Sequence, residues 1–176
     1  MNLDYLINRR DRVWELTLQH LGLSAGAVLI ALLFAVPLGV LAARNQRIST
    51  PLLGILGAIY TIPSLAFLAL LIPSLGIGRR PAIVVLAAYA QIFLVRNIAT
   101  GLRTASVTTI SLATVAAWIG AGGLGTLLFE GITRDDPDRI LAGAIAITAL
   151  ALLTDAVLRF AESMTATARA RRAGQG

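Results

Sequence analysis

Glycines are densest in residues 120–125, where Gly120, Gly122, Gly123 and Gly125 occupy four of six positions. Their spacing matches the G-x-G-x-x-G pattern that holds a dinucleotide pyrophosphate at the start of a helix. That chemistry also needs a preceding β-strand and a βαβ unit, whereas this segment lies late in a long apolar run. We therefore interpret the glycines as a break or bend in a helix that lets another backbone approach closely.

Two proline motifs interrupt another apolar run. Thr61, Pro63 and Ser64 belong to the first motif, and residues 72–74 (IPS) form the second. A proline inside a membrane helix frees a backbone carbonyl, which is tolerated where protein or a water-filled cavity covers it. Transporters use broken helices of this kind around their pathways. Simple packing is the alternative interpretation of each motif, and of the glycine segment as well.

Side chains that do acid–base or metal chemistry are scarce in the apolar part of the chain. Asp155 is the one acid there, and its spacing to Arg159 favours an i,i+4 ion pair. The single histidine, His20, stands at the start of the first apolar run, where we expect an interfacial polar residue rather than a ligand. The charged residues of 130–139 resemble a solvated loop, with a docking surface as the alternative. We expect no catalytic residue, no metal site and no cofactor in this chain.

Composition indicates a membrane protein. Of 176 residues, 57% are hydrophobic and 14% charged, against about 25% charged in a typical soluble domain. That excludes an ordinary soluble enzyme and a disordered chain, and the absence of cysteine excludes a disulfide-stapled domain. All 15 basic residues are arginines, giving a net charge of +6. They lie at the ends of apolar segments, which is typical of membrane-interface anchors and not of a nucleic-acid-binding face.

Five runs lack charge and histidine, at residues 21–43, 51–78, 81–95, 104–129 and 140–154. A helix needs roughly 20 apolar residues to cross a bilayer core. The first, second and fourth runs are long enough, and the fifth is nearly so if it extends to 158. The third must place Arg79 and Arg80 at the membrane surface or continue past Arg96. We predict an all-α integral membrane protein with about five transmembrane helices.

The chain divides into three predicted parts. Residues 1–20 show apolar residues at helical spacing and form an interfacial amphipathic segment. Residues 21–160 form the transmembrane domain, and residues 161–176 form a basic tail. With the N-terminus outside, the arginines divide eight inside to seven outside, and the tail beside the last span favours a cytoplasmic C-terminus. No cleavable signal peptide is visible.

The ordered motifs resemble those of binding-protein-dependent ABC importer permeases. The matching segments are 14–21 (WELTLQHL), 36–44 (VPLGVLAAR), 60–66 (YTIPSLA), 71–78 (LIPSLGIG), 93–102 (FLVRNIATGL) and 103–125. The branch that they most resemble takes up osmoprotectants such as glycine betaine, choline, carnitine and proline. The resemblance covers nearly the whole chain. It adds Arg96 and Asn97 to the motif residues that are candidates for packing or gating.

One departure concerns the cytoplasmic loop with a Glu-Ala-Ala pattern that docks into the ATPase subunit of such importers. Here the two flanking segments are joined directly at Leu102 and Arg103. The chain must turn within residues 96–103 or form one helix over 82–119, which is about 57 Å long and strained in a core of about 30 Å. The resemblance therefore predicts the permease fold without the loop that couples it to ATP hydrolysis.

The resemblance implies a defined set of partners. Two permeases, identical or different, pair around a central path in the inner membrane of a bacterium or archaeon. A substrate-binding protein lies outside the membrane, and two ATPase subunits lie inside. Membrane lipid surrounds the helices, and no nucleic acid is expected. The chain has no phosphate-binding G-x-x-x-x-G-K-[ST] loop, so nucleotide would bind the ATPase alone. The open alternative is an uncoupled remnant or assembly subunit that has lost ATPase docking.

Overall fold

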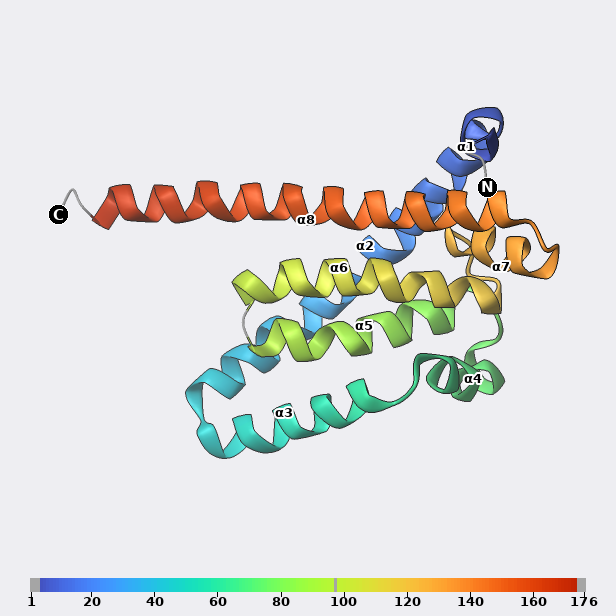
Figure 1. The fold of residues 1–176 in the computed structure, drawn as a ribbon. Coiled ribbons are helices and arrows are strands. Elements are labelled where there is room, and N and C mark those ends of the chain that lie inside the picture. The colour runs from blue at the N-terminus through green and yellow to red at the C-terminus, as the bar shows by residue number, and fades with distance from the viewer. Residues whose placement is uncertain (1–3, 97, 174–176) are drawn as a thin grey trace.

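The computed structural model describes residues 4–96 and 98–173, which fold as helices with no strand among them. The predicted all-helical architecture is confirmed (Figure 1). The elements are α1 (Asp4–Asn8), α2 (Arg10–Arg44), α3 (Gln46–Thr61), α4 (Ser64–Leu75), α5 (Arg79–Arg96), α6 (Ile98–Ala116), the 3-10 turn η1 (Ala117–Ile119), α7 (Gly125–Thr133) and α8 (Pro137–Ala173).

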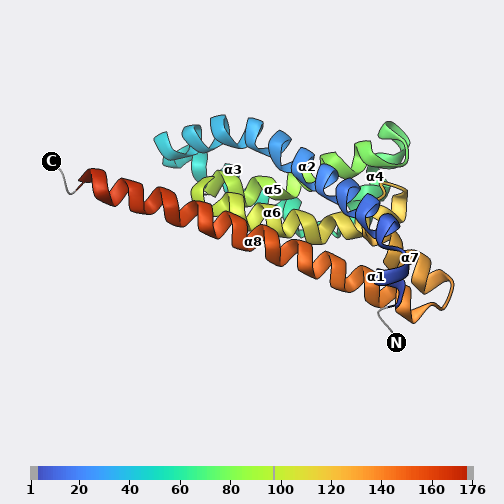
Figure 2. The same ribbon diagram turned by 90° about the horizontal axis from the view of Figure 1, so that it is seen from above.

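The long helices share one general direction, whereas α4 crosses it (Figures 1 and 2). Helix α5 is central and packs most extensively against α2 and α6. The bundle has two ends, which are named here the Arg44 end and the Gly120 end. The Arg44 end holds the ends of α2 and α5 and the start of α6, and the C-terminus of α8 projects past it. The Gly120 end holds the start of α2, the end of α6, and α7.

Three helical segments are long and apolar enough to cross a membrane, namely Arg10–Arg44, Gly101–Ile119 and Pro137–Met164. Helices α3 and α4 make a fourth span if their bent pair is counted as one. Helix α5 is the remaining apolar segment of the five predicted, and it carries arginine at both ends. At 18 residues it is about 27 Å long, close to the thickness of a bilayer core. By length and composition, three to four membrane spans are therefore counted, and α5 is the one predicted span that is not among them.

The predicted boundaries of the three parts do not coincide with helix ends. Residue 20 lies inside α2, which continues without interruption from Arg10 to Arg44. Residue 160 lies inside α8, which continues to Ala173. The fourth predicted run is divided as well, because α6 ends at Ala116 and α7 begins only at Gly125.

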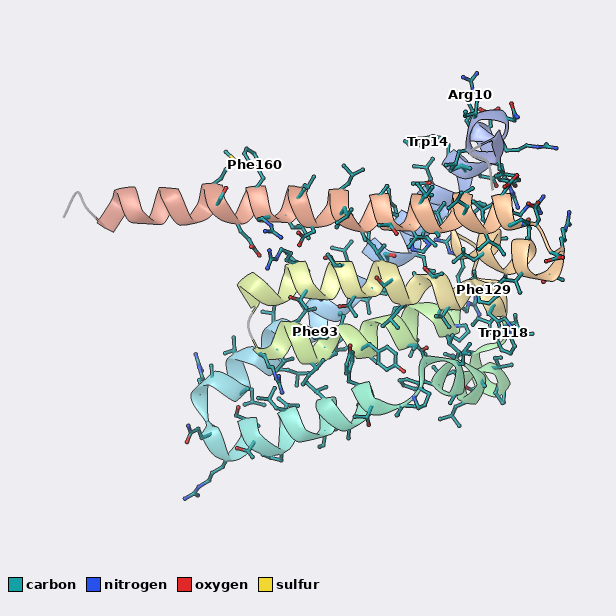
Figure 3. The ribbon with its side chains drawn as sticks, viewed as in Figure 1. Arg10, Trp14, Phe93, Trp118, Phe129 and Phe160 are labelled. Atoms are coloured by element: carbon teal, nitrogen blue, oxygen red, sulfur yellow. The ribbon has the colours of Figure 1, made fainter. Side chains whose placement is uncertain are left out.

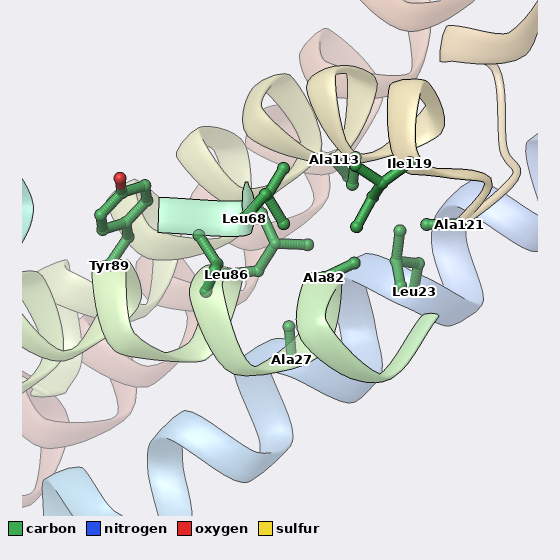
Figure 4. Packing of buried hydrophobic residues seen from close by; sticks show 11 residues of the cluster. Leu23, Ala27, Leu68, Ala82, Leu86, Tyr89, Ala113, Ile119 and Ala121 are labelled. Carbon is green, nitrogen blue, oxygen red and sulfur yellow. The ribbon is translucent and has the colours of Figure 1, made fainter. Parts of the chain in front are cut away.

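Small and aliphatic side chains hold the bundle together. Leu23 and Ala27 of α2 meet Ala82 and Leu86 of α5 in the centre of one buried cluster, which Ala113 and other residues of α6 complete (Figure 4). Alanines at these contacts let the helix axes approach closely, which favours dispersion contacts where lipid offers no hydrophobic driving force. This packing fixes α5 against α2 and α6, and with it the residues of the site described below.

Prolines differ in their effect on the helices. Pro37, Pro51 and Pro73 lie inside α2, α3 and α4. The motif at residues 72–74 therefore does not break the helix at its proline, contrary to the prediction. The helix ends after Leu75, where Gly76 adopts a φ of 76° that side chains disfavour. Pro63, by contrast, lies at a true break between α3 and α4.

Candidate functional site

The Pro63 motif turns the chain sharply in the middle of an apolar segment. Helix α3 ends at Thr61, helix α4 begins at Ser64, and the two are bent by 93°. Ile62 and Pro63 are extended, with ψ of 129° and 131°, as expected for a residue that precedes proline and for the proline itself. The Thr61 hydroxyl donates a hydrogen bond of 2.7 Å to the Ala58 carbonyl oxygen and so covers one carbonyl at the end of α3.

A hollow of about 280 Å³ opens at this break. Its lining combines the α3–α4 turn with side chains of α5 and α6, as follows: Tyr60, Thr61, Ile62, Pro63, Ser64, Tyr89 and Leu112. The Tyr89 hydroxyl donates a hydrogen bond to the carbonyl oxygen of Ile62. That carbonyl has no helical partner because the helix is broken there, so Tyr89 provides the cover that an exposed backbone group needs in a membrane. Three of the sequence-predicted residues, Thr61, Pro63 and Ser64, thus share one concave surface.

Aromatic rings cluster around the hollow. The ring centroids of Tyr60 and Tyr89 are 5.6 Å apart, and those of Tyr60 and Phe93 are 5.3 Å apart, in both cases with edge-to-face geometry. Phe67 lies 5.8 Å from Tyr89. Sequence reasoning assigned no aromatic cluster, because these rings come from three helices and meet only in the folded bundle. The visible signal was the pair of tyrosines in otherwise apolar runs.

The glycine segment lies against the start of α2, at the Gly120 end of the bundle. Gly120, Gly122 and Gly123 have φ of 76°, 80° and 87°, which L side chains rarely adopt. A Cβ on Gly122 would lie 2.6 Å from Gln19 Oε1, and one on Gly123 would lie 2.9 Å from His20 Nδ1. The Gly123 N–H donates a hydrogen bond to Gln19.

Gly125 meets a different neighbour, because a Cβ there would collide with the carbonyl oxygen of Thr114 in α6. The chain therefore folds back on α6 as it enters α7. No strand precedes the glycines within the described residues, and α6 and η1 lead into them instead. The segment serves close backbone packing in this fold, and a gating role stays a prediction.

His20 is buried inside the bundle, and its interfacial depth stays a prediction. Its side chain is 0% exposed, and Nε2 lies 2.8 Å from the carbonyl oxygen of Ile110. A carbonyl only accepts, so Nε2 carries the proton. The partners are 90 residues apart in sequence, and no periodicity of α2 alone indicates such a contact. Among the described residues, no group of three or more His, Cys, Asp or Glu side chains is placed to hold a metal ion.

A second buried polar side chain joins α5 to α2. Gln91 is 8% exposed, and its Nε2 donates a hydrogen bond of 2.9 Å to the Ala31 carbonyl oxygen. Sequence reasoning missed this residue, although it is the one amide side chain in the apolar run 81–95. A polar group in a membrane helix that bonds across to its neighbour strengthens their association.

Charged residues form two networks, one at each end of the bundle. At the Gly120 end, Arg139 lies 3.0 Å from Glu130 and 3.4 Å from Asp136, and its guanidinium lies 5.0 Å from the centroid of the Tyr5 ring. Its side chain is only 16% exposed. Part of the predicted solvated loop is therefore a partly buried network that ties α1, α7 and α8 together, whereas Arg134 and Asp135 are exposed as predicted.

At the Arg44 end, the predicted pair of Asp155 and Arg159 is confirmed, with 2.6 Å between the nitrogen and oxygen atoms. Arg103 of α6 joins it, 3.7 Å from Asp155 and 3.9 Å from Glu162. This network links α6 to α8.

The reversal between α5 and α6 is short. Helix α5 ends at the exposed Arg96 and α6 begins at Ile98, so the turn falls within the predicted window 96–103. Asn97 lies outside the described residues. The two helices are so close near the turn that a Cβ on Gly101 would collide with the carbonyl oxygen of Phe93. Of the two possibilities derived from the sequence, a hairpin and one continuous helix, the structure has the hairpin. The expected join at Leu102 and Arg103 lies inside α6.

Tryptophans lie near the Gly120 end, and Phe160 lies toward the other (Figure 3). Trp14 and Trp118 are 65% and 60% exposed, and Phe160 is 67% exposed. Exposed tryptophans at one level of an apolar bundle are typical of a membrane–water interface.

Comparison with known proteins gives the family. No protein-family model matches the chain. It is 35% identical to the carnitine transport permease protein OpuCB of Listeria monocytogenes over 180 positions, which cover 81% of this chain and 83% of that protein. It is also 35% identical to the choline transport system permease protein OpuBB of Bacillus subtilis, covering 83% and 85% of the two chains. For the osmoprotectant import permease protein OsmW of Salmonella typhimurium, identity is 34% over 89% of this chain and 93% of that protein.

The alignments are longer than the part that this chain contributes to them. For the carnitine permease, 81% of 176 residues is about 143 residues, whereas the alignment has 180 positions, leaving about 37 without a residue of this chain. The relatives named above are transport subunits and not enzymes. With more than 80% of each of them covered at 34–35% identity, this chain belongs to the family of permease subunits of osmoprotectant ABC importers.

Proposed function

We propose that this chain forms, with a second permease subunit, the membrane path of an importer for quaternary ammonium osmoprotectants. The observation that carries the proposal is the similarity to permeases named for carnitine and choline transport over more than four-fifths of each. Glycine betaine, choline and carnitine share a trimethylammonium group, so one path with one kind of recognition serves them all. The broken helix at Pro63 supports this function, because transporter paths are built from such backbone breaks.

The proposed assembly has the parts of a binding-protein-dependent importer. A binding protein delivers substrate from outside the membrane, and in a coupled importer of this type two separate ATPase subunits supply the energy. The chain lies in the inner membrane as a multi-pass protein, pairs with an identical or different permease, and binds no cofactor itself. The Arg44 end faces the cytoplasm in this arrangement, because the basic tail that follows the last span lies on that side.

This chain differs from the family's pattern at the segment that would couple the permease to the ATPase. A change driven by ATP needs a contact that differs between the two states of the permease. The family's docking loop would lie near the α5–α6 reversal, and here Arg96 and Ile98 leave one residue between the two helices. The alignment with the carnitine permease leaves about 37 positions in total without a residue of this chain, which leaves room for the loss of such a loop. We therefore propose that this chain has lost the ATPase contact while it retains the permease fold. The names of the relatives support a transport subunit and not an unrelated assembly role.

The function is tested with a chain in which a loop of the family's type is inserted between Leu102 and Arg103. Proteoliposomes that contain this version, its partner permease, the ATPase and the binding protein are supplied with radiolabelled choline, carnitine and glycine betaine. Saturable uptake of at least one of them, reduced by an excess of the others, supports the proposed substrate class. Uptake of none of the three by an assembled and ATP-hydrolysing complex contradicts it.

A further inference from the structure

The hollow at the α3–α4 break presents an aromatic ring to its interior. Tyr60 is 42% exposed, whereas Tyr89 is only 3% exposed. Both line the hollow, the Phe93 ring packs edge-to-face against Tyr60, and the Phe67 ring packs at a tilt against Tyr89. The hydrogen bond from Tyr89 to the Ile62 carbonyl oxygen fixes the second ring. The Tyr60 ring is thus available to a ligand, and it packs against Tyr89 and Phe93.

The lining contains no charged side chain and several oxygen atoms. Thr61, Ser64 and Ile62 line it together with the two tyrosines, and the Thr61 and Tyr89 hydroxyls already donate to backbone carbonyl oxygens. No carboxylate is present to pair with a primary ammonium or to bind a metal ion. A quaternary ammonium group needs no hydrogen-bond acceptor, because it carries no N–H, and aromatic faces attract it electrostatically.

The depth of the hollow fits a substrate in transit. Along α5, Tyr89 is ten residues from Arg79 and seven from Arg96, or about 15 and 10 Å at 1.5 Å per residue. If the arginines mark the two surfaces of the membrane, the hollow lies near the middle of the span. Transporters place substrate sites at that depth beside discontinuous helices.

We propose that the hollow between Tyr60 and Tyr89 is a transit site for the trimethylammonium group of the substrate, with Tyr60 as the ring that contacts it. The inference rests on the proposed function for its substrate class, while the site itself rests on the geometry of the break. Tyr89 is a positioning residue that holds the turn open through Ile62.

The test measures binding to the purified chain in lipid nanodiscs, without ATPase or binding protein. Choline is compared with 3,3-dimethylbutan-1-ol, its neutral isostere with the same shape. Saturation-transfer NMR on the methyl protons reports contact with aromatic protons, and equilibrium dialysis with labelled choline reports affinity. The expected result is binding of choline in preference to the isostere, because only the cation interacts with the ring quadrupole.

Three variants locate the site. Tyr60→Leu should weaken choline binding roughly three- to thirtyfold, the range that a cation–π contact spans, whereas Tyr60→Phe should retain most of it. Phe160→Leu, at an exposed aromatic of α8, is the matched control and should change nothing. Circular dichroism and detergent stability verify that each variant folds.

Equal binding of choline and the isostere, no binding at all, or unchanged affinity in a folded Tyr60→Leu variant each overturn the transit site. Binding that is displaced by lipid alone has the same meaning, because the hollow is then a lipid groove. These outcomes are separate from the proposed function. Uptake by the assembled, loop-restored importer that is unaffected by Tyr60→Leu rejects the site and keeps the function. If choline binding depends on Tyr60 but the assembled, loop-restored importer takes up none of the substrates, the site is kept and the function is rejected.

Discussion

The backbone N–H of Gly123 donates a hydrogen bond of 3.2 Å to Oε1 of Gln19, across 104 residues of sequence. This contact fastens the turn between α6 and α7 onto the first turns of α2. The positive φ of Gly123 disfavours any residue with a side chain, and a Cβ at this position would collide with His20. The glycine segment therefore closes the Gly120 end of the bundle through backbone contact.

Replacement of Gly123 with leucine should destabilise the protein by about 2–4 kcal/mol, through backbone strain and the collision with His20. Thermal unfolding in detergent and gel filtration measure the effect. Gly54→Leu is the matched control, because nothing lies within 4 Å of a Cβ at that position of α3, and it should leave stability unchanged or slightly higher. Equal stability of the two variants contradicts the packing role of the segment.

The ion pair between Arg103 and Asp155 should contribute to the association of α6 with α8. Both side chains are about 30% exposed, and Arg159 shares the carboxylate. A double-mutant cycle with Arg103→Gln and Asp155→Asn is therefore expected to give a coupling energy of about 0.5–1 kcal/mol, which is modest because water screens the pair. Urea or SDS titration of the four proteins measures it. A coupling energy of zero would contradict a contribution of this pair to the association of α6 with α8.

The sequence predicted most of the helices, because a long run of apolar residues without charge can be recognised from local composition alone. The charge-free runs located α2, α5 and α8, and Pro63 located the break between α3 and α4. The same reasoning erred at Pro73, which lies inside α4 two residues before the helix ends at Leu75. Hydropathy alone does not separate α6 from α7, because the glycine segment is apolar, whereas the glycines of residues 120–125 predicted the break that lies between the two helices.

The site was predictable only in part. Thr61, Pro63 and Ser64 are visible as a motif, whereas Tyr60, Tyr89 and Phe93 meet through the packing of α3 against α5. His20 illustrates the same limit, since its partner Ile110 lies on another helix 90 residues away. Contacts of this kind depend on helix register and crossing geometry, which no single segment encodes.

The C-terminus should lie in the cytoplasm. Arg44, Arg96 and the start of α6 lie at the same end of the bundle as the C-terminal end of α8, and the basic tail beside this last span favours a cytoplasmic position for that end. A reporter that is fluorescent only in the cytoplasm, fused after Gly176, should be bright, and a reporter active only outside should be silent. The reverse pattern contradicts the proposed orientation and would place the α5–α6 hairpin outside.

Loss of the ATPase contact predicts that the chain as it stands does not support ATP-driven uptake, even with its ATPase and binding protein present. One residue between α5 and α6 leaves no space for a docking helix at that reversal. Insertion of a loop of the family's type between Leu102 and Arg103 should restore uptake if the rest of the fold is intact. A loop of equal length made of glycine and serine controls for length alone and should restore nothing.

The most direct measurement is the initial rate of radiolabelled choline or betaine uptake into proteoliposomes, with and without ATP, for the unmodified and the loop-restored chain. ATP should increase the rate only for the loop-restored chain, whereas the unmodified chain should give the same low rate in both conditions. Robust ATP-dependent uptake by the unmodified chain would contradict the lost contact, and would mean that another surface of this chain or its partner permease engages the ATPase.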